Sequence, residues 1–350
     1  MNNPIELRQD NKRGSQSTQI AEQNNYYGMD YQNTRALCLD LIKDELDTYK
    51  NEAETIARER DEKLLKTFFE RLYNEKLSDE NVCEEFKNPD MQYTYVEAQK
   101  AYIRLGTQEL EDMLADLLVC RVKENKRTLF QITLSEAMTV VPMLLPEQLD
   151  ILALCFRLGY TKSLKVNSIN SFFDYLNHSV LPHISSISDR RSLYQHLVYA
   201  KVGSIDIGQS LLEEIISEDY GGLFLNGYTS DELQDYLSKY PTYFTQCHQN
   251  PEKIQVNATS TKDLSELLEK NEEIDSADKK NLQDLFAKNM MSKAEIKNFI
   301  CKKSPNYEAL FNLWNNSDLK HLSLTSVGMV LGASRAKQLS GDTFDLNIWI

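Results

Sequence analysis

The stretch "TRALCLDLIKDELDTYKNEAETIARERDEKLLKTFFERLYNEK", from Thr34 to Lys76, has the apolar spacing of a long amphipathic helix. Neither glycine nor proline occurs between Asp30 and Leu77. A continuous helix of this length would extend roughly 70 Å at about 1.5 Å per residue. The mostly charged middle, Asn51 to Lys63, leaves open a division into two helices near Lys50. Most of the apolar residues recur at intervals of three and four and form one stripe: Leu37, Leu41, Ile42, Leu46, Tyr49, Ala53, Ile56, Ala57, Leu64, Leu65, Phe68, Phe69 and Leu72.

The rest of the chain also predicts helices with short connections, because only 12 glycines and 8 prolines occur in 350 residues. Gly106 follows one predicted helix and Thr107 begins the next, so we expect a positive φ at Gly106. The alternating apolar residues of "TFDLNIWI" (Thr343–Ile350) predict a buried terminal strand. The predicted fold is mainly α: a multi-helix body with a long N-terminal amphipathic helix and short β segments at the N-terminal strip and the C-terminus.

The predicted domain organisation has three parts, since 350 residues exceed the size that one core usually serves. A polar tail with a β strip covers residues 1–29. A helical domain that includes the long helix covers 30–247. A smaller helical domain with the terminal strand covers 262–350. The boundary is the stretch "QCHQNPEKIQVNATSTKD" (Gln246–Asp263), which has almost no large apolar residue.

The formal net charge of −14 disfavours binding to nucleic acid or to an anionic membrane surface. The six cysteines stand apart and form no C-x-x-C pair. The first twenty residues are polar and do not have the apolar core of a signal peptide. No apolar run approaches the roughly 18 residues that a membrane-spanning helix needs. We therefore expect a reduced protein of the cytoplasm without membrane contact.

A short polar strip precedes the long helix and favours β structure. In "GSQSTQI" (Gly14–Ile20), Thr18 and Ile20 fall two residues apart on one face, and Ser15 lies at the beginning. A lone strand is unstable in water, so this strip needs a partner unless it is an unstructured tail. One hypothesis is that the strip adds to the sheet of another copy or of a partner protein. Ser15, Thr18, Ile20, Leu37, Leu41 and Ile42 are then the predicted oligomerisation residues.

Motifs for catalysis, cofactors and metals are absent from the sequence. The five histidines do not have the spacing of a zinc pair, so we predict no metal. No phosphate-binding glycine loop or G-x-S-x-G occurs, so we predict no cofactor and assign no catalytic residue. The sequence favours a protein without enzymatic activity. An enzyme with a composite site near the glycine-rich segment Gly203–Gly227 stays an alternative.

The C-terminal region offers a different alternative. "LKHLSLTSVGMVLGASRAKQ" (Leu319–Gln338) places a turn before a helix, as winged-helix regulators do. In that case Lys320, Arg335 and Lys337 would be the possible phosphate contacts. The acidic surroundings instead favour a helical packing unit in which Thr325 caps the last helix. Nucleic-acid binding is therefore the alternative and not the leading prediction.

Three stretches together resemble a family of uncharacterised bacterial proteins: Gly14–Ile20, "DYQNTRALCLDLIKDEL" (Asp30–Leu46), and the ending "LTSVGMVLGASRAKQ…FDLNIWI". Similar G-x-x-S-T-x-I strips begin some bacterial conflict and anti-phage proteins. The short LT-x-x-G ending is similar to that of the abortive-infection alpha family. The resemblance implies a bacterial and defence-related context, and it transfers no active-site residue.

These observations lead to one functional hypothesis. We expect a non-enzymatic, self-associating interaction protein of bacterial cytoplasm that forms part of an anti-phage, abortive-infection-like system. The expected partners are further copies of the chain and another bacterial or phage protein.

Overall fold

The structure is a computed structural model that describes residues 31–350 except 77–78, 125 and 189. Side chains are described from Lys50 onward, apart from those of residues 77–81, 125 and 189. The predicted strip with Ser15, Thr18 and Ile20 lies outside the described residues. The chain divides into two units, Met1–Thr55 and Ile56–Ile350. The second unit holds almost all of the described side chains, and the fold is described from it.

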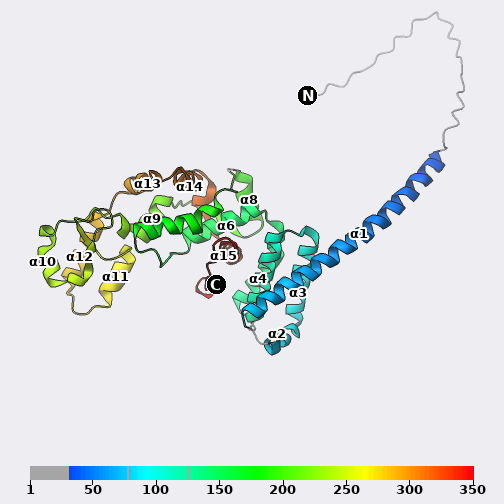
Figure 1. Cartoon of the computed structure of the whole chain (residues 1–350), viewed down its shortest axis with the longest axis horizontal. Helices are drawn as coiled ribbons and strands as arrows, with labels where there is room; N and C mark the ends of the chain where they lie inside the picture. The colour runs from blue at the N-terminus through cyan, green and yellow to red at the C-terminus, as the bar shows by residue number, and fades with distance from the viewer. Residues whose placement is uncertain (1–30, 77–78, 125, 189) are drawn as a thin grey trace, which may run out of the picture. The chain divides into compact units, whose positions relative to one another are not determined.

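The prediction of a mainly α fold is confirmed, since the described residues are mostly helical and their sheets are short pairs. Figure 1 shows the order of the helices along the chain. The first six helices are α1 (Tyr31–Asn74), α2 (Asp79–Phe86), α3 (Pro89–Leu105), α4 (Gln108–Lys123), α5 (Leu129–Val140) and α6 (Pro146–Gly159). The next six are α7 (Ile169–Tyr175), α8 (Arg191–Tyr199), α9 (Leu212–Tyr220), α10 (Gln234–Lys239), α11 (Thr261–Glu269) and α12 (Ser276–Asn289). The last are α13 (Lys293–Cys301), α14 (Pro305–Asn316) and α15 (Ser326–Ser340).

The long helix is continuous, so the alternative of a break near Lys50 is wrong. α1 contains 44 residues, and its part from Ile56 onward belongs to the second unit. There Leu64, Phe68 and Leu72 are buried at intervals of four. The Phe68 ring lies 6.0 Å from the ring of Phe86 and so joins α1 to α2. The apolar stripe of the sequence thus identifies the packed face of this part of α1.

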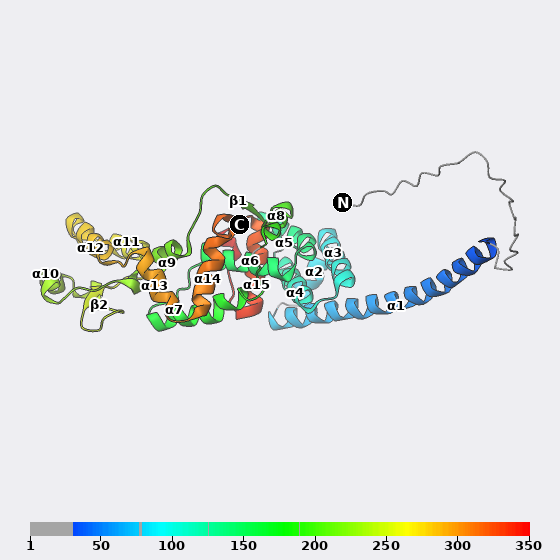
Figure 2. The same ribbon diagram turned by 90° about the horizontal axis from the view of Figure 1, so that it is seen from above.

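α15 lies in the centre of the second unit, beside α6 in both views (Figures 1 and 2), and also packs against α4 and α5. A Cβ atom at Gly328 would overlap the carbonyl oxygen of Val202, and one at Gly332 would lie 2.7 Å from that of Leu152. Both positions therefore need glycine because a neighbouring backbone approaches so closely. Thr325 caps α15 by accepting a hydrogen bond from the N–H of Gly328, as the sequence predicted.

The apolar core of the described residues has two parts. The larger part joins residues from Leu64 to Phe224 with residues from Ile296 to Ala333. The smaller part lies between them and is formed by Leu225, Leu233, Phe244, Val256, Leu264, Leu268, Ile274, Leu282 and Phe286. The polar stretch Gln246–Asp263 falls inside this smaller part, where β2 (Phe244–Gln246) pairs with β3 (Ile254–Val256). Low apolar content therefore marks a hairpin here, and α13 to α15 return to the larger core.

The prediction of a terminal strand is wrong. Thr343–Ile350 contains a single 3-10 turn at Leu346–Ile348, and Ile348 is 73% exposed. Asp345 accepts a hydrogen bond from the N–H of Asn347, which favours the turn. Phe344 and Trp349 instead pack edge-on against Phe156 of α6. The strand in this region is β4 (Leu322–Leu324), which pairs antiparallel with β1 (Gly203–Ile205).

Gly106 has the predicted positive φ, 67°, and ends α3. Gly106→Ala should lower the free energy of unfolding by about 1–2 kcal/mol, because a side chain is disfavoured in this conformation. The new Cβ would also overlap the guanidinium of Arg60, whose Nη1 donates to the carbonyl of Ile103 at 2.6 Å. Gly159→Ala is the matched control, since no atom lies within 4 Å of its added Cβ. Urea unfolding of both variants checks this; equal midpoints would contradict it.

Candidate functional site

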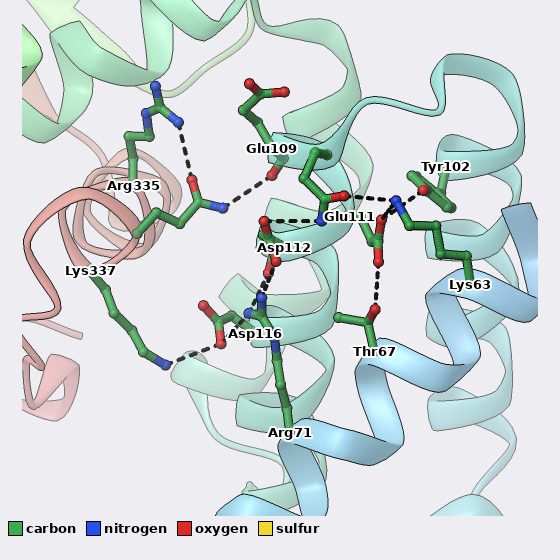
Figure 3. A network of polar contacts seen from close by, with 12 residues as sticks. Lys63, Thr67, Arg71, Tyr102, Glu109, Glu111, Asp112, Asp116, Arg335 and Lys337 are labelled. Carbon is green, nitrogen blue, oxygen red and sulfur yellow. Dashed lines mark hydrogen bonds and ion pairs between the residues drawn. The ribbon is translucent and has the colours of Figure 1, made fainter.

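The structure places the predicted site residues in separate regions. Leu37, Leu41 and Ile42 lie on α1 in the first unit, where side chains are outside the description. Lys320 lies just before β4, and its Nζ donates to the carbonyl of Asn315 at 2.8 Å. Arg335 and Lys337 lie on α15 and belong to a polar network that links α1, α4 and α15 (Figure 3).

The first part of this network is the buried carboxylate of Glu111 on α4. Lys63 of α1 forms an ion pair with it at 2.7 Å, and Thr67 of α1 donates to its other oxygen. The hydroxyl of Tyr102 donates to it at 2.8 Å. Burial raises the pKa of Glu111, but these hydrogen bonds outweigh burial and hold the pKa below its usual value. Glu111 is therefore ionised and anchors α1 to α4 (Figure 3).

The second part joins α1 to α15 through acidic residues of α4. Arg71 of α1 pairs with Asp112 and, at 2.6 Å, with Asp116. Lys337 of α15 reaches the same Asp116 at 3.1 Å. Gln338 donates to the backbone carbonyl of Glu109 at 3.1 Å (Figure 3). Two cations from separate helices thus share one carboxylate, which fixes the position of α4 between them.

Arg335 forms a buried ion pair that ties α15 to α6. Its Nε donates to Asp150 Oδ1 at 2.7 Å and its Nη2 to Oδ2 at 3.2 Å. His183 and Ser186 also bond this carboxylate, at 3.2 Å and 2.6 Å. Burial raises the pKa of Asp150, but the three partners outweigh it and lower the pKa. Burial lowers the pKa of His183, which therefore stays neutral at neutral pH.

Two of the three predicted phosphate contacts, Arg335 and Lys337, already form ion pairs within the protein. Arg335 is buried and already bonded to a carboxylate, and Lys337 is paired. Within α15 only Leu339 is exposed. A helix that enters a nucleic-acid groove needs an exposed face with available cations. Phosphate binding by Lys320, Arg335 and Lys337 stays a prediction, and the described contacts give it no support.

Arg335→Met should destabilise the protein by about 3–5 kcal/mol, because it leaves the buried Asp150 without its cation. Lys337→Met is the matched control on the same helix. Its side chain is 39% exposed, so we expect a loss of about 0–1 kcal/mol. Urea unfolding gives both values. Equal losses would contradict the structural role of the Asp150–Arg335 pair.

A cavity of about 390 Å³ lies near the glycine-rich segment that the sequence singled out. The loop residue Asp206, Asp219 of α9, Tyr160 beyond α6 and His321 before β4 line it. His321 Nδ1 lies 2.6 Å from the carbonyl oxygen of Gly208. Only a protonated Nδ1 can donate to a carbonyl, so in neutral His321 the basic nitrogen is Nε2.

Asp219 is the carboxylate of this cavity with the most perturbed pKa. Burial and the neighbouring Glu218 raise the pKa of Asp219 to about 6, while Lys162 lowers it. No hydrogen bond to its carboxylate occurs among the described residues. A carboxyl group that titrates near neutral pH can give or take a proton under physiological conditions. The cavity can thus supply acid–base chemistry or accept a hydrogen-bonding ligand.

Asp219→Asn should raise stability most at alkaline pH. An unfolded Asp has a pKa of about 3.9, so the folded state binds the proton more tightly. The resulting destabilisation builds up as the pH rises from about 4 to about 6 and is constant above that. The gain in the free energy of unfolding should be largest near pH 8 and disappear towards pH 4. Urea unfolding across this range checks it, with Glu266→Gln, an exposed carboxylate that does not line the cavity, as the control. A gain that does not depend on pH would contradict the raised pKa.

The described part of the chain has neither a metal-binding cluster nor a membrane-spanning helix. There no group of three or more His, Cys, Asp and Glu residues lies close enough to hold a metal ion. None of the described helices has both the length and the apolar character that crossing a membrane requires.

Comparison with known proteins identifies a family for the chain. A family model covers residues 28–350, and the family is uncharacterised. The chain belongs to this family. The match leaves out the strip Gly14–Ile20, so it adds nothing to the predicted motif there. No curated protein and no solved structure matches the chain.

Sequence analysis missed the buried charges of α6, although a signal for them exists. "PEQLDILALCFRLG" contains Asp150 and Arg157 within an apolar run. They are seven residues apart and therefore lie on the same face of a helix. Buried charges need partners of opposite sign, and Arg335 and Asp342, also seven apart, provide them. Asp219 gave no such signal, because acidic residues are common on helices.

Proposed function

We propose that the protein is a non-enzymatic, self-associating interaction protein and that α1 is its oligomerisation element. The observation that supports this most is the continuity of α1 across the two units of the chain. The residues of α1 before Ile56 belong to a unit separate from the helical body. A helix of a second copy would bury the apolar stripe of this part of α1.

The sequence spacing of α1 is suited to helix pairing. Ile42, Leu46, Tyr49 and Ala53 follow one another at intervals of four, three and four. This alternation is the seam of a coiled coil, and charged residues lie beside it. Beyond Ala53 the apolar stripe continues through Ala57 to the buried Leu64, Phe68 and Leu72 of the body, at intervals of four or seven. Leu37 and Leu41 lie to the side of this seam, so they would contribute less than Ile42.

The energetics favour association. An isolated helix is marginally stable in water, and most helical stability in proteins comes from packing of an apolar face. The Lys50–Thr55 segment of α1 is exposed in the single chain. The contacts of Glu111 and Asp116 hold the later part of α1 on the body. A second copy could therefore bind the stripe without displacing α1 from α4.

The cellular context rests on the resemblance of the sequence. We propose a bacterial cytoplasmic protein with a role in anti-phage defence, in which the strip at Gly14–Ile20 adds a second contact between copies or with a bacterial or phage protein. Nucleic-acid binding is the weaker proposal, since α15 is largely buried. Acid–base catalysis at the smaller cavity is the second candidate, and the raised pKa of Asp219 favours it.

Light scattering after size exclusion tests self-association of the full chain. We expect a mass larger than that of the monomer for the parent protein. Ile42→Gln with Leu46→Gln should reduce the mass to that of the monomer, because both changes remove apolar area from the seam. Asp40→Gln with Asp44→Gln is the matched control, with the same spacing on the opposite side of the helix, and should leave the mass unchanged.

The experiment has clear contrary results. A monomeric parent protein at all concentrations would refute self-association. A parent oligomer that both double variants preserve would refute the role of α1. A second preparation that begins at Gly28 separates the contribution of the strip from that of α1.

A further inference from the structure

A second cavity, of about 850 Å³, lies where α6 ends. Three parts of the chain line it: the end of α6 with the loop Thr161–Val166, α7 with the turn that follows it, and the tail beyond α15. All three parts belong to the second unit. The volume is within the range of about 300–1,000 Å³ that small-molecule sites occupy.

The buried guanidinium of Arg157 lines this cavity and has unused donors. Arg157 is 2% exposed, and its Nη2 donates to Ala336 O at 3.2 Å and to the hydroxyl of Ser340, and pairs with Asp342 at 2.9 Å. Its Nε has no acceptor. No described residue accepts a hydrogen bond from its Nη1 either. A guanidinium has five N–H donors, and buried donors without acceptors are rare in proteins. The Nε atom is enclosed by the protein and closed to a ligand, so an anionic group in the cavity would bond the guanidinium through Nη1.

A second cation stands at the same cavity. Lys165 of the loop lines it, is exposed, and forms no ion pair among the described residues. Lys162, by contrast, is paired with Asp263. Lys165 can therefore turn its ammonium towards a ligand without breaking an existing contact.

Aromatic rings form part of the wall. Phe344 lies over the Arg157 guanidinium at 5.5 Å, and Trp349 lines the cavity beside it. Tyr175 contributes a third ring. Such a wall favours a ligand with a planar or apolar part next to its charge.

The carboxylates restrict the charge of the ligand. Asp174 and Asp345 line the cavity, are exposed and have no cation partner among the described residues. They would repel a polyanion such as a nucleic-acid strand. A ligand with one localised negative group can reach Arg157 and Lys165 while its uncharged part faces the rest of the cavity.

We propose that this cavity binds a small organic anion whose single carboxylate or phosphate-monoester group is held by Arg157 and Lys165 and whose ring packs against Trp349. This site lies in the second unit and is independent of the proposed self-association. It is a binding site, and no chemical step is assigned to it.

Titration of the full-length protein with phenyl phosphate and with benzoate tests the proposal, with phenol as the neutral probe. Calorimetry measures affinity, and tryptophan fluorescence reports on Trp349, since the other tryptophan, Trp314, does not line this cavity. We expect at least one anion to bind and phenol not to bind. The stronger anion identifies the oxyanion that the site prefers.

Variants of Lys165 and Arg157 test whether these two side chains bind the anion. Lys165→Glu should weaken binding about tenfold or more, as expected for loss of a charge-assisted hydrogen bond. Lys270→Glu is the matched control, since Lys270 is also exposed and unpaired in the described part of the chain. Arg157→Lys keeps the charge but removes the guanidinium donors, and should weaken binding while circular dichroism shows a folded protein. Absence of binding by both anions, equal binding of phenol, or equal affinities of the two lysine variants would overturn the proposal.

Discussion

The close packing of α15 against its neighbours is the constraint on which the second unit depends. Gly328 and Gly332 allow the backbone of α15 to approach the carbonyls of Val202 and Leu152. At this distance only small residues fit, so the two glycines fix both the position and the rotation of α15. The fixed rotation directs Arg335 at Asp150 and Lys337 at Asp116. A side chain added at Gly332 would therefore disturb apolar packing and the ion pairs together.

The ion pairs of α15 act more on specificity than on net stability. Two buried charges lose hydration, and their attraction regains little beyond that loss. Breaking one pair leaves an uncompensated charge, which excludes alternative rotations of the helix. Asp150 with Arg335 is such a pair, and two turns further along α6 the buried Arg157 pairs with the partly exposed Asp342. Asp116, shared by Arg71 and Lys337, extends the same constraint from α15 to α1.

Local signals in the sequence predicted the helices and their ends well. A cap needs only a few neighbouring residues, so Gly106, Thr107 and Thr325 could be recognised without knowledge of the fold. The prediction of a terminal strand failed because alternating apolar residues form a strand only where a neighbouring strand can pair with them. Here the nearest surface is α6, and Phe344 and Trp349 pack on Phe156 instead. Tertiary contacts decide whether such short apolar segments form strands.

The candidate sites were less predictable for a related reason. A cavity forms where distant segments meet, and Asp219 and His321 lie about one hundred residues apart in the sequence. Neither residue belongs to a motif, so only the three-dimensional arrangement shows that they share a cavity. The glycine-rich segment Gly203–Gly227 gave the correct neighbourhood, because its loop supplies Asp206 to the cavity wall. That segment did not indicate which other residues, such as Asp219 and His321, form the rest of the cavity wall.

The end of α6 is one place where this network is incomplete and a cavity lies beside it. Two other buried arginines of the second unit use more than one nitrogen. Arg335 bonds one carboxylate through two nitrogens, and Arg121 bonds two carboxylates. Arg157 uses only Nη2, although it is as deeply buried. Tyr160 lies three residues after Arg157 and lines both cavities. Arg157 lines the larger cavity and Asp219 the smaller one, and each has hydrogen-bonding atoms without a partner among the described residues. Nε of Arg121 and Nε2 of His183 are also without acceptors, so an unpaired atom does not by itself identify a ligand site. The adjacent cavities are what give Arg157 and Asp219 access to a ligand.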